Sequence, residues 1–154
     1  MKDNPFYTFQ KEIADALNGD PWFIERRCAA IAEDEGDTNT AIDTKITQDR
    51  GIAMTVRTPG GKFLGDEGAD TVRISADPLQ ILISEIPAIN RLEPGHTTAL
   101  GCLARLIHAL RDDGWGFIGY RKHDLPGGEI GVTADFRTTF PVRDPTAPEL
   151  PANH

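Results

Sequence analysis

The sequence predicts an α+β fold: a mainly antiparallel sheet of four to six strands, two or three helices packed on one face, an extended loop and a hairpin. Two observations predict it. Apolar residues recur at helical spacing near the N-terminus and again around residue 100, and they alternate in several segments between and after these helices. The 154 residues fit one domain, which we place at residues 1–142, followed by a proline-rich, extended tail at residues 143–154.

Composition excludes several classes of protein. The formal charge of -8 argues against a protein that grips nucleic acid, because phosphate binding depends on lysine and arginine. No apolar run approaches the roughly 18 residues of a membrane span, and the charged N-terminus is unlike a secretory signal. Cys28 and Cys102 are far apart and lack CxxC spacing, so we interpret them as small buried hydrophobic residues in a reducing, cytoplasmic environment.

The first predicted element is an amphipathic helix from Asn4 to Asn18. Asn4 is a good N-cap and Gly19 a good stop signal. After a turn at Asp20 and Pro21, we expect a strand from Ile24 to Ile31. The segment from Thr38 to Gln48 has helical spacing but four threonines, so we predict only a short helix there.

The middle of the chain alternates between strand and loop patterns. Ile52, Met54 and Val56 alternate as in a strand. Residues 58–70 contain Pro59 and several glycines and acids, which predicts a long mobile connection. Val72 and Ile74 then open a strand that Pro78 interrupts at a bulge or an edge, and residues 79–86 form a buried strand.

The last third contains the most regular patterns. Residues 97–112 carry a wide apolar stripe that predicts the main helix. A hairpin follows, with a turn at residues 124–128 and a return strand at residues 130–142. This strand alternates strictly, so we expect one buried face and one face toward water or a partner.

We find no catalytic pattern, and we expect no enzyme activity, no cofactor and no metal. Gly60, Gly61 and Lys62 do not complete a phosphate-binding loop, because Val56 and Phe63 stand where glycine and serine or threonine are required. The four histidines lack the spacing of metal ligands. The acidic run at residues 33–37 lacks the order of a calcium loop and is interpreted as a solvated turn.

Three extensions suit assembly: residues 58–70, the turn at residues 124–128 and the tail. Each is equally compatible with tolerated surface variation.

The segment Glu85-Ile86-Pro87-Ala88-Ile89-Asn90-Arg91 ends a buried strand in a turn, and an Ala/Leu-rich helix with Leu106-Ile107-His108 and a final hairpin follow. This order of elements, together with the opening Asn-Pro-Phe helix and the Gly51-Ile52 strand, resembles tail-terminator and tail-completion proteins of tailed bacteriophages. The resemblance covers roughly residues 4–142 and is one of pattern. It implies a small α+β subunit of a ring, often a hexamer, that caps the tail tube and meets the head connector.

The resemblance therefore implies a virion protein of the tail or neck, assembled in the host cytoplasm, with a homo-oligomer, the tail tube protein and head-tail connector proteins as partners. DNA would pass through the lumen without specific binding, and acids such as those of residues 33–37 and 66–70 would repel it. The candidate interface residues are Lys62, Phe63, Asp66, Glu67, Asp70, Asn90, Arg91 and Asp124.

For the turn that ends in Asn90 and Arg91, we favour a structural role over a contact with the next subunit. Asn90 would adopt positive φ, and Arg91 would pair with Glu93 or another nearby acid. Two alternative functions stay open. One is a head-closure or connector protein at the same junction. The other is a small-ligand-binding α+β domain in which residues 58–70 form a lid.

Overall fold

A computed structural model describes residues 4–33, 49–112, 114–124 and 126–148. The predicted helix from Thr38 to Gln48 lies outside them. The described helices are α1 (Pro5–Asn18), α2 (Pro21–Glu25), α4 (Pro87–Asn90) and α5 (Ala99–Asp112), with a short 3-10 helix at Pro126–Gly128. The strands are β1 (Ala29–Ala32), β2 (Ile52–Arg57), β3 (Gly61–Asp66), β4 (Thr71–Glu85), β5 (Gly116–Asp124) and β6 (Ile130–Arg143).

The strands form one mixed sheet in the order β1-β2-β4-β6-β5, and β3 also pairs with β4. β1 and β2 are parallel, and every other pair is antiparallel. The predicted α+β class and the mainly antiparallel sheet are therefore confirmed. The hydrophobic core contains residues of α1, α5 and the sheet, and Ile13, Leu106, Ile81 and Phe136 belong to this one buried cluster.

Helix α1 has the predicted boundaries because its capping signals are local. The Asn4 side chain accepts a hydrogen bond from the backbone N–H of Phe6 at 3.0 Å, and the chain leaves the helix at Gly19. The face with Ile13 and Leu17 is buried in the core.

The predicted strand from Ile24 to Ile31 is wrong over most of its length. Asp20 caps helix α2 by accepting a hydrogen bond from the N–H of Trp22 at 2.9 Å, and Pro21 occupies the first turn. The helix ends in a motif in which Cys28 N–H donates to Phe23 O at 3.0 Å, and the strand begins only at Ala29.

The prediction of a long mobile loop at residues 58–70 is also wrong. Residues 61–66 form β3, which pairs with β4 in a hairpin. Glycine is required at position 61 of this strand, because a Cβ there would lie 2.6 Å from the carbonyl oxygen of Ser75. β4 continues through Pro78, and its register with β6 shifts between Ala76 and Leu79, so the predicted bulge is confirmed.

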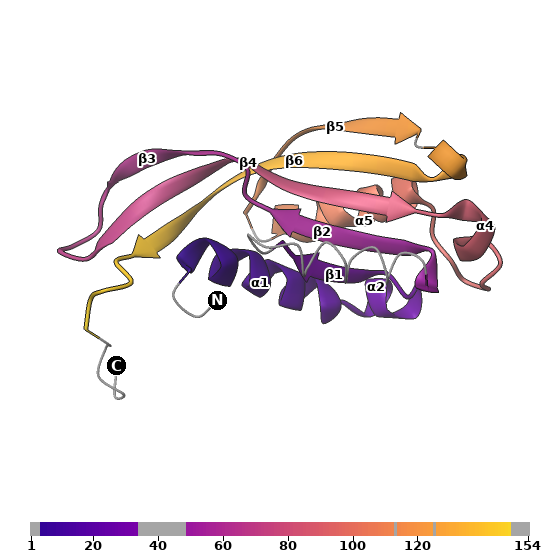
Figure 1. Ribbon diagram of the computed structural model, residues 1–154, viewed down its shortest axis with the longest axis horizontal. Helices are drawn as coiled ribbons and strands as arrows, with labels where there is room; N and C mark the ends of the chain where they lie inside the picture. The colour runs from indigo at the N-terminus through magenta and orange to yellow at the C-terminus, as the bar shows by residue number, and fades with distance from the viewer. Residues whose placement is uncertain (1–3, 34–48, 113, 125, 149–154) are drawn as a thin grey trace.

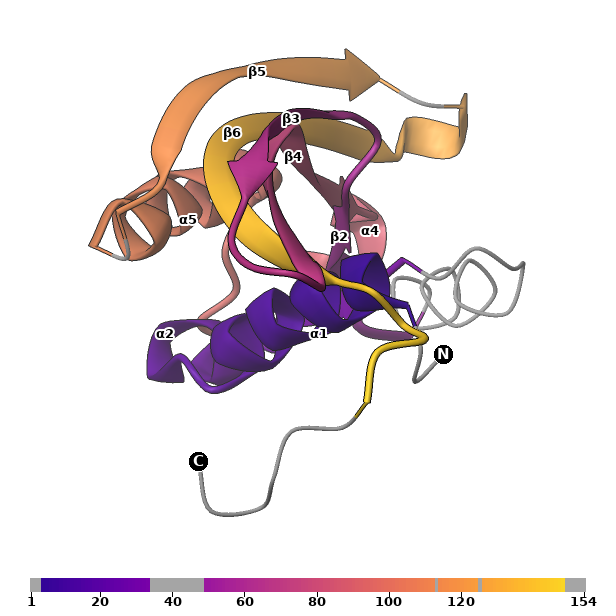
Figure 2. The same ribbon diagram turned by 90° about the vertical axis from the view of Figure 1, so that its left-hand side faces the viewer.

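β4 and β6 are longer than β2 and β5, so their paired ends reach beyond the helices together with β3. We call this three-stranded extension the arm: Gly61–Asp66 of β3, residues 71–76 of β4 and residues 138–143 of β6. Figure 1 shows the arm projecting from the body, with α4 at the opposite end of the sheet. Figure 2 looks along the sheet from the arm side, with α1 and α5 beside the strongly curved strands.

Both faces of the sheet are closed at its centre. Thr55, Gln80 and Thr133 alternate with the core residues of their strands and are nevertheless buried. The second face of β6 was expected to meet water or a partner, but Thr133 on this face is already buried within the chain. Beyond β6, residues 144–147 form a turn in which Ala147 N–H donates to Asp144 O at 3.0 Å, so this part of the tail is not extended as predicted.

Candidate assembly surfaces

The edge strand β3 presents apolar side chains to solvent. Phe63 keeps 64% of its surface exposed and Leu64 keeps 54%. The register between β3 and β4 shifts between Phe63 and Gly65, which makes Leu64 the extra residue of a β-bulge. Among the described residues, no strand pairs with the outer edge of β3. The edge of the arm thus carries two adjacent apolar side chains, Phe63 and Leu64, that the described part of the chain covers only in part.

The other edge strand, β5, has the same local design. Phe117, Ile118 and Tyr120 are exposed, and the register with β6 shifts between Phe117 and Gly119. Ile118 is therefore a bulged residue like Leu64. The common signal in the sequence is the triplet Phe-Leu-Gly at residues 63–65 and Phe-Ile-Gly at residues 117–119. Of these apolar side chains, only Phe63 was predicted as an interface residue.

These two apolar edges lie on opposite sides of the sheet. β4 pairs with β6 along one side, so β2 and β3 both occupy its other side, and β5 lies beyond β6. Strand β3 therefore forms part of one edge of the sheet and β5 forms the other edge. One molecule therefore carries two different apolar surfaces, one on each of two edge strands of the sheet.

The predicted interface residues Lys62, Phe63, Asp66, Glu67 and Asp70 come together on the arm and its turn. Most of their charges have partners. Glu67 pairs with Arg73, Asp70 with Arg143 at 3.8 Å, and Lys62 with Asp77 at 3.7 Å. These cations lower the negative potential that the acids present, so the arm is less acidic than its run of carboxylates suggested.

The remaining predicted residues, Asn90, Arg91 and Asp124, lie at the opposite end of the sheet. β4 alone spans 15 residues between these ends, which corresponds to about 45 Å. Asp124 ends β5 with its side chain largely exposed, 3.9 Å from the Nζ of Lys122. The structure therefore divides the predicted interface into two separate clusters.

Asn90 has a structural role within the domain, which is the role that we favoured for it. Its side chain is buried, and its Nδ2 donates to Glu85 Oε2 and to Thr97 O, both at 2.7 Å. It lies in α4 and does not have positive φ; among the residues that the structure describes, the non-glycine residue with positive φ is Arg27. Arg91 pairs with Glu85 at 3.3 Å, while Glu93 pairs with Arg27 instead.

Glu85 is the centre of this end of the domain. It is wholly buried, and its Oε1 accepts a hydrogen bond from Ala99 N–H at 3.1 Å, at the first residue of α5. A carboxylate at a helix N-terminus satisfies unpaired backbone donors and interacts favourably with the helix dipole. The network that joins Glu85, Asn90 and Ala99 therefore fixes the start of the main helix against the end of β4.

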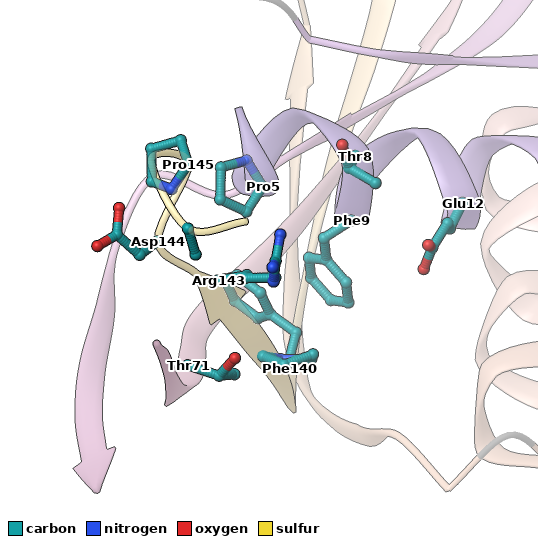
Figure 3. A pocket seen from close by; sticks show the side chains of 11 residues that line it. Pro5, Thr8, Phe9, Glu12, Thr71, Phe140, Arg143, Asp144 and Pro145 are labelled. Carbon is teal, nitrogen blue, oxygen red and sulfur yellow. The ribbon is translucent and has the colours of Figure 1, made fainter. Parts of the chain in front are cut away.

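Figure 3 shows side chains that line a groove between α1 and the arm, including Thr71 and Arg143 at the end of β4–β6 pairing. The volume of this groove is about 540 Å³. In this groove Phe9 stacks on Phe140 with ring centroids 4.1 Å apart, and the charged residues Glu12 and Arg143 also line the groove. A second groove of about 380 Å³ lies between α1 and α5. Residues 58–70 line neither groove, so the lid that one alternative requires does not lie over these two grooves.

In the part of the chain that the structure describes, no group of three or more His, Cys, Asp or Glu residues has the arrangement to hold a metal ion. His96 contacts the carbonyl oxygen of Glu93 through Nδ1 at 2.9 Å, while His108 and His123 are exposed. Among the same residues, no helix is long and apolar enough to cross a membrane.

Comparison with known proteins adds no relative: no protein-family model matches the sequence, and no curated protein matches it.

Proposed function

We propose that this chain is a virion structural protein, a tail-terminator or tail-completion subunit of a tailed bacteriophage that assembles into a homo-oligomeric ring, with a hexamer as the expected size. In this role it caps the tail tube and joins it to the head connector. The observation that carries the proposal is the pair of apolar, bulged edges on opposite sides of one sheet, Phe63 and Leu64 on β3 and Ile118 on β5.

Two different surfaces on one subunit favour a ring over a simple dimer. A two-fold dimer uses the same patch on both partners, whereas a head-to-tail contact uses two patches and closes into a ring when the rotation permits. The bulges at Leu64 and Ile118 fit this role. A bulge hinders uncontrolled strand pairing at a sheet edge, while it leaves the side chain available for a specific contact.

The free energy available from the apolar contact favours assembly on the tail tube protein. Full burial of a large apolar side chain contributes roughly 1.5–3 kcal/mol, so the exposed groups of β3 and β5 supply at most about 10 kcal/mol together. Association itself costs about 4–15 kcal/mol. The edges alone therefore give weak association, and a stable ring would require closure of all contacts or binding to the tail tube protein.

The proposal includes DNA passage through the ring without specific binding. The net charge of -8 supports this, since excess carboxylates repel a duplex. It also includes a finer arrangement in which the helices cover one face of the sheet: α1 and α5 both contribute to the core cluster that contains Ile83. The virion, with assembly in the host cytoplasm, would be the location of the protein.

Light scattering coupled to size-exclusion chromatography, over a series of concentrations, tests the proposal. Wild type is expected to reach the mass of a closed ring, alone or with tail tube protein. Leu64→Asp and Ile118→Asp are each expected to prevent this. Leu92→Asp is the matched control, because Leu92 is 81% exposed but lies on neither edge. A wild-type monomer that ignores tube and connector proteins would contradict the proposal.

A head-closure or connector protein at the same junction would form a similar ring and differ in the face that it uses. Gene order separates the two, because a major tail protein encoded immediately downstream supports the terminator role.

The groove between α1 and α5 favours a second candidate, a small-ligand-binding domain. Its volume is within the range of ligand pockets. Phe9, Leu17 and Trp115 provide apolar walls, and Arg105 pairs there with Asp20 at 2.7 Å. This candidate predicts that an apolar carboxylic acid raises the melting temperature and that Ala109→Trp, which fills the groove, abolishes the rise.

A further inference from the structure

The two cysteines of the chain, 74 positions apart in sequence, are in direct contact. The Sγ of Cys28 lies 3.6 Å from the Sγ of Cys102, and both thiols are free. Cys28 follows α2 and precedes β1, whereas Cys102 lies in the first turn of α5. The fold therefore brings together two thiols from distant segments at a separation that a small side-chain movement would reduce to the bond length of a disulfide.

Both cysteines are buried, but their surroundings differ. Cys102 is wholly buried, whereas Cys28 keeps 3% of its surface exposed and lines an open pocket of about 590 Å³. Arg27 and Arg50 line the same pocket, which Cys102 does not line. A reagent that enters this pocket therefore meets Cys28 before Cys102.

We propose that Cys28 and Cys102 are a redox modification site, at which Cys28 reacts first with an anionic small-molecule disulfide and Cys102 then completes an intramolecular disulfide. Oxidised glutathione is a reagent of this class, and its carboxylates complement Arg27 and Arg50. The inference does not depend on assembly into a ring.

The reaction balances as two thiol–disulfide exchanges. The thiolate of Cys28 attacks one sulfur of the oxidised glutathione, which breaks its S–S bond and releases one glutathione thiolate. Cys102 loses its proton and attacks the sulfur of Cys28, which forms the protein disulfide and releases the second glutathione. Two protein thiols are oxidised, one disulfide reagent is reduced to two thiols, and the two protons pass to the released glutathione molecules.

The environment of Cys102 agrees with this order. Its hydrogen bond with Cys28, together with burial and the negative charge of Glu85, raises the pKa of the Cys102 thiol well above its ordinary value. A thiol that keeps its proton is a poor first nucleophile. The rise in pKa becomes smaller when Cys28 has been modified, because the hydrogen bond to its thiol, the largest cause of the rise, is lost, while burial and Glu85 still contribute.

The disulfide would tie α5 to the segment before β1. It would close a loop between two residues 74 positions apart, which restricts the conformations of the unfolded chain. Oxidation is therefore expected to raise the melting temperature by about 5 °C or more.

The test is to incubate folded, reduced protein with excess oxidised glutathione, denature it in acid, alkylate the remaining thiols and measure the intact mass. The proposal predicts a monomer lighter by two hydrogen atoms, without alkyl groups and with the higher melting temperature. Two alkylated thiols after incubation, or disulfide-linked dimers, would overturn it.

Two variants test the order of the steps. Cys102→Ser is expected to accumulate one glutathione adduct, since Cys28 reacts but no second thiol resolves it. Cys28→Ser is expected to stay unmodified while folded. An adduct on Cys102 in folded Cys28→Ser would overturn the assigned order. The wild-type mass measurement tests the disulfide itself, even if either variant folds poorly.

Charge at the pocket supplies an independent readout. Arg50→Gln and high salt are each expected to slow oxidation by oxidised glutathione, but not by the neutral reagent hydroxyethyl disulfide. Equal slowing of both reagents would contradict the part assigned to the arginines.

Discussion

The Nε of Arg91 lies 3.3 Å from the Oε2 of Glu85, which joins a wholly buried carboxylate to an arginine side chain that keeps 47% of its surface in water. Helix α4 makes this possible, because its single turn carries the chain from the end of β4 to the protein surface within six residues. The charge of Glu85 is thus compensated from outside, while Asn90 and the N–H of Ala99 satisfy its oxygens from inside.

Replacement of Glu85 is expected to destabilise the domain. Glu85→Gln keeps the shape of the side chain, but its NH2 group would face N–H groups that donate hydrogen bonds to the carboxylate in the wild type. The substitution should therefore lower the free energy of unfolding by about 2–3 kcal/mol. Urea denaturation measures this loss. Arg91→Gln is the comparison and should cost only about 1 kcal/mol, because water can solvate the exposed side of the pair. Equal midpoints for Glu85→Gln and wild type would refute the role of the carboxylate.

Gly51 and Gly114 form a matched pair for a test of close packing. Both have positive φ, 83° and 84°, but a Cβ at Gly51 would lie 2.4 Å from the backbone N of Asn90, whereas a Cβ at Gly114 meets nothing within 4 Å. Gly114→Ala should therefore cost about 1 kcal/mol of conformational strain. Gly51→Ala should cost about 3 kcal/mol or more, because α4 must also move. Similar losses in thermal or urea unfolding would show that the contact with α4 is unimportant.

Arg27 occupies a backbone conformation that favours glycine. Its φ is 58°, at the position that ends α2, and Cys28 N–H closes the motif on Phe23 O. Arg27→Gly should raise the free energy of unfolding by about 0.5–1 kcal/mol through relief of strain. Arg27→Ala, which also loses the exposed ion pair with Glu93 but keeps a Cβ, should not stabilise. If Ala stabilises as much as Gly, backbone strain is not the cause.

The Cys102 thiol predicts a loss of stability at alkaline pH. Its hydrogen bond with Cys28 and its burial raise its pKa in the folded protein above the ordinary value of 9.0. Between these two pKa values the unfolded chain loses a proton that the folded protein keeps, so the contribution of this group is complete below pH 9 and falls as pH rises toward the folded pKa. Unfolding free energies measured under reducing conditions should decrease more steeply above pH 9 in wild type than in Cys102→Ala. Parallel curves would contradict this assignment.

The sequence allowed prediction of elements whose signals are local. Asn4 and Gly19 mark the ends of α1 regardless of the rest of the molecule, and the alternation in residues 130–142 marks β6. Helix α2 also had a local signal, Asp20 before Pro21, but these residues were interpreted as a turn, followed by a strand from Ile24 to Ile31. The signals for α1, β6 and α2 all come from residues that are close together in the sequence.

Elements that depend on a distant partner could not be predicted in this way. The glycines of residues 58–70 indicate a loop, but pairing with β4 makes residues 61–66 a strand, and Gly61 is required by the approach of Ser75. Prediction of the interface residues was limited for the same reason. Phe63 was predicted, but the equivalence of Leu64 and Ile118 became visible only when both proved to be bulged residues on opposite edges.

The most direct test of a head-to-tail ring is to mix two variants that each lose one edge. Leu64→Asp keeps an intact β5 edge, and Ile118→Asp keeps an intact arm, so the mixture can form one heterologous contact but cannot extend it. A single contact is weak, so the mixtures are examined at concentrations well above those at which wild type forms its ring. Sedimentation velocity of equimolar mixtures is predicted to show a concentration-dependent heterodimer that neither variant forms alone. Sedimentation of the mixture identical to that of each variant alone across this range would contradict the account, as would a full ring formed by either variant alone.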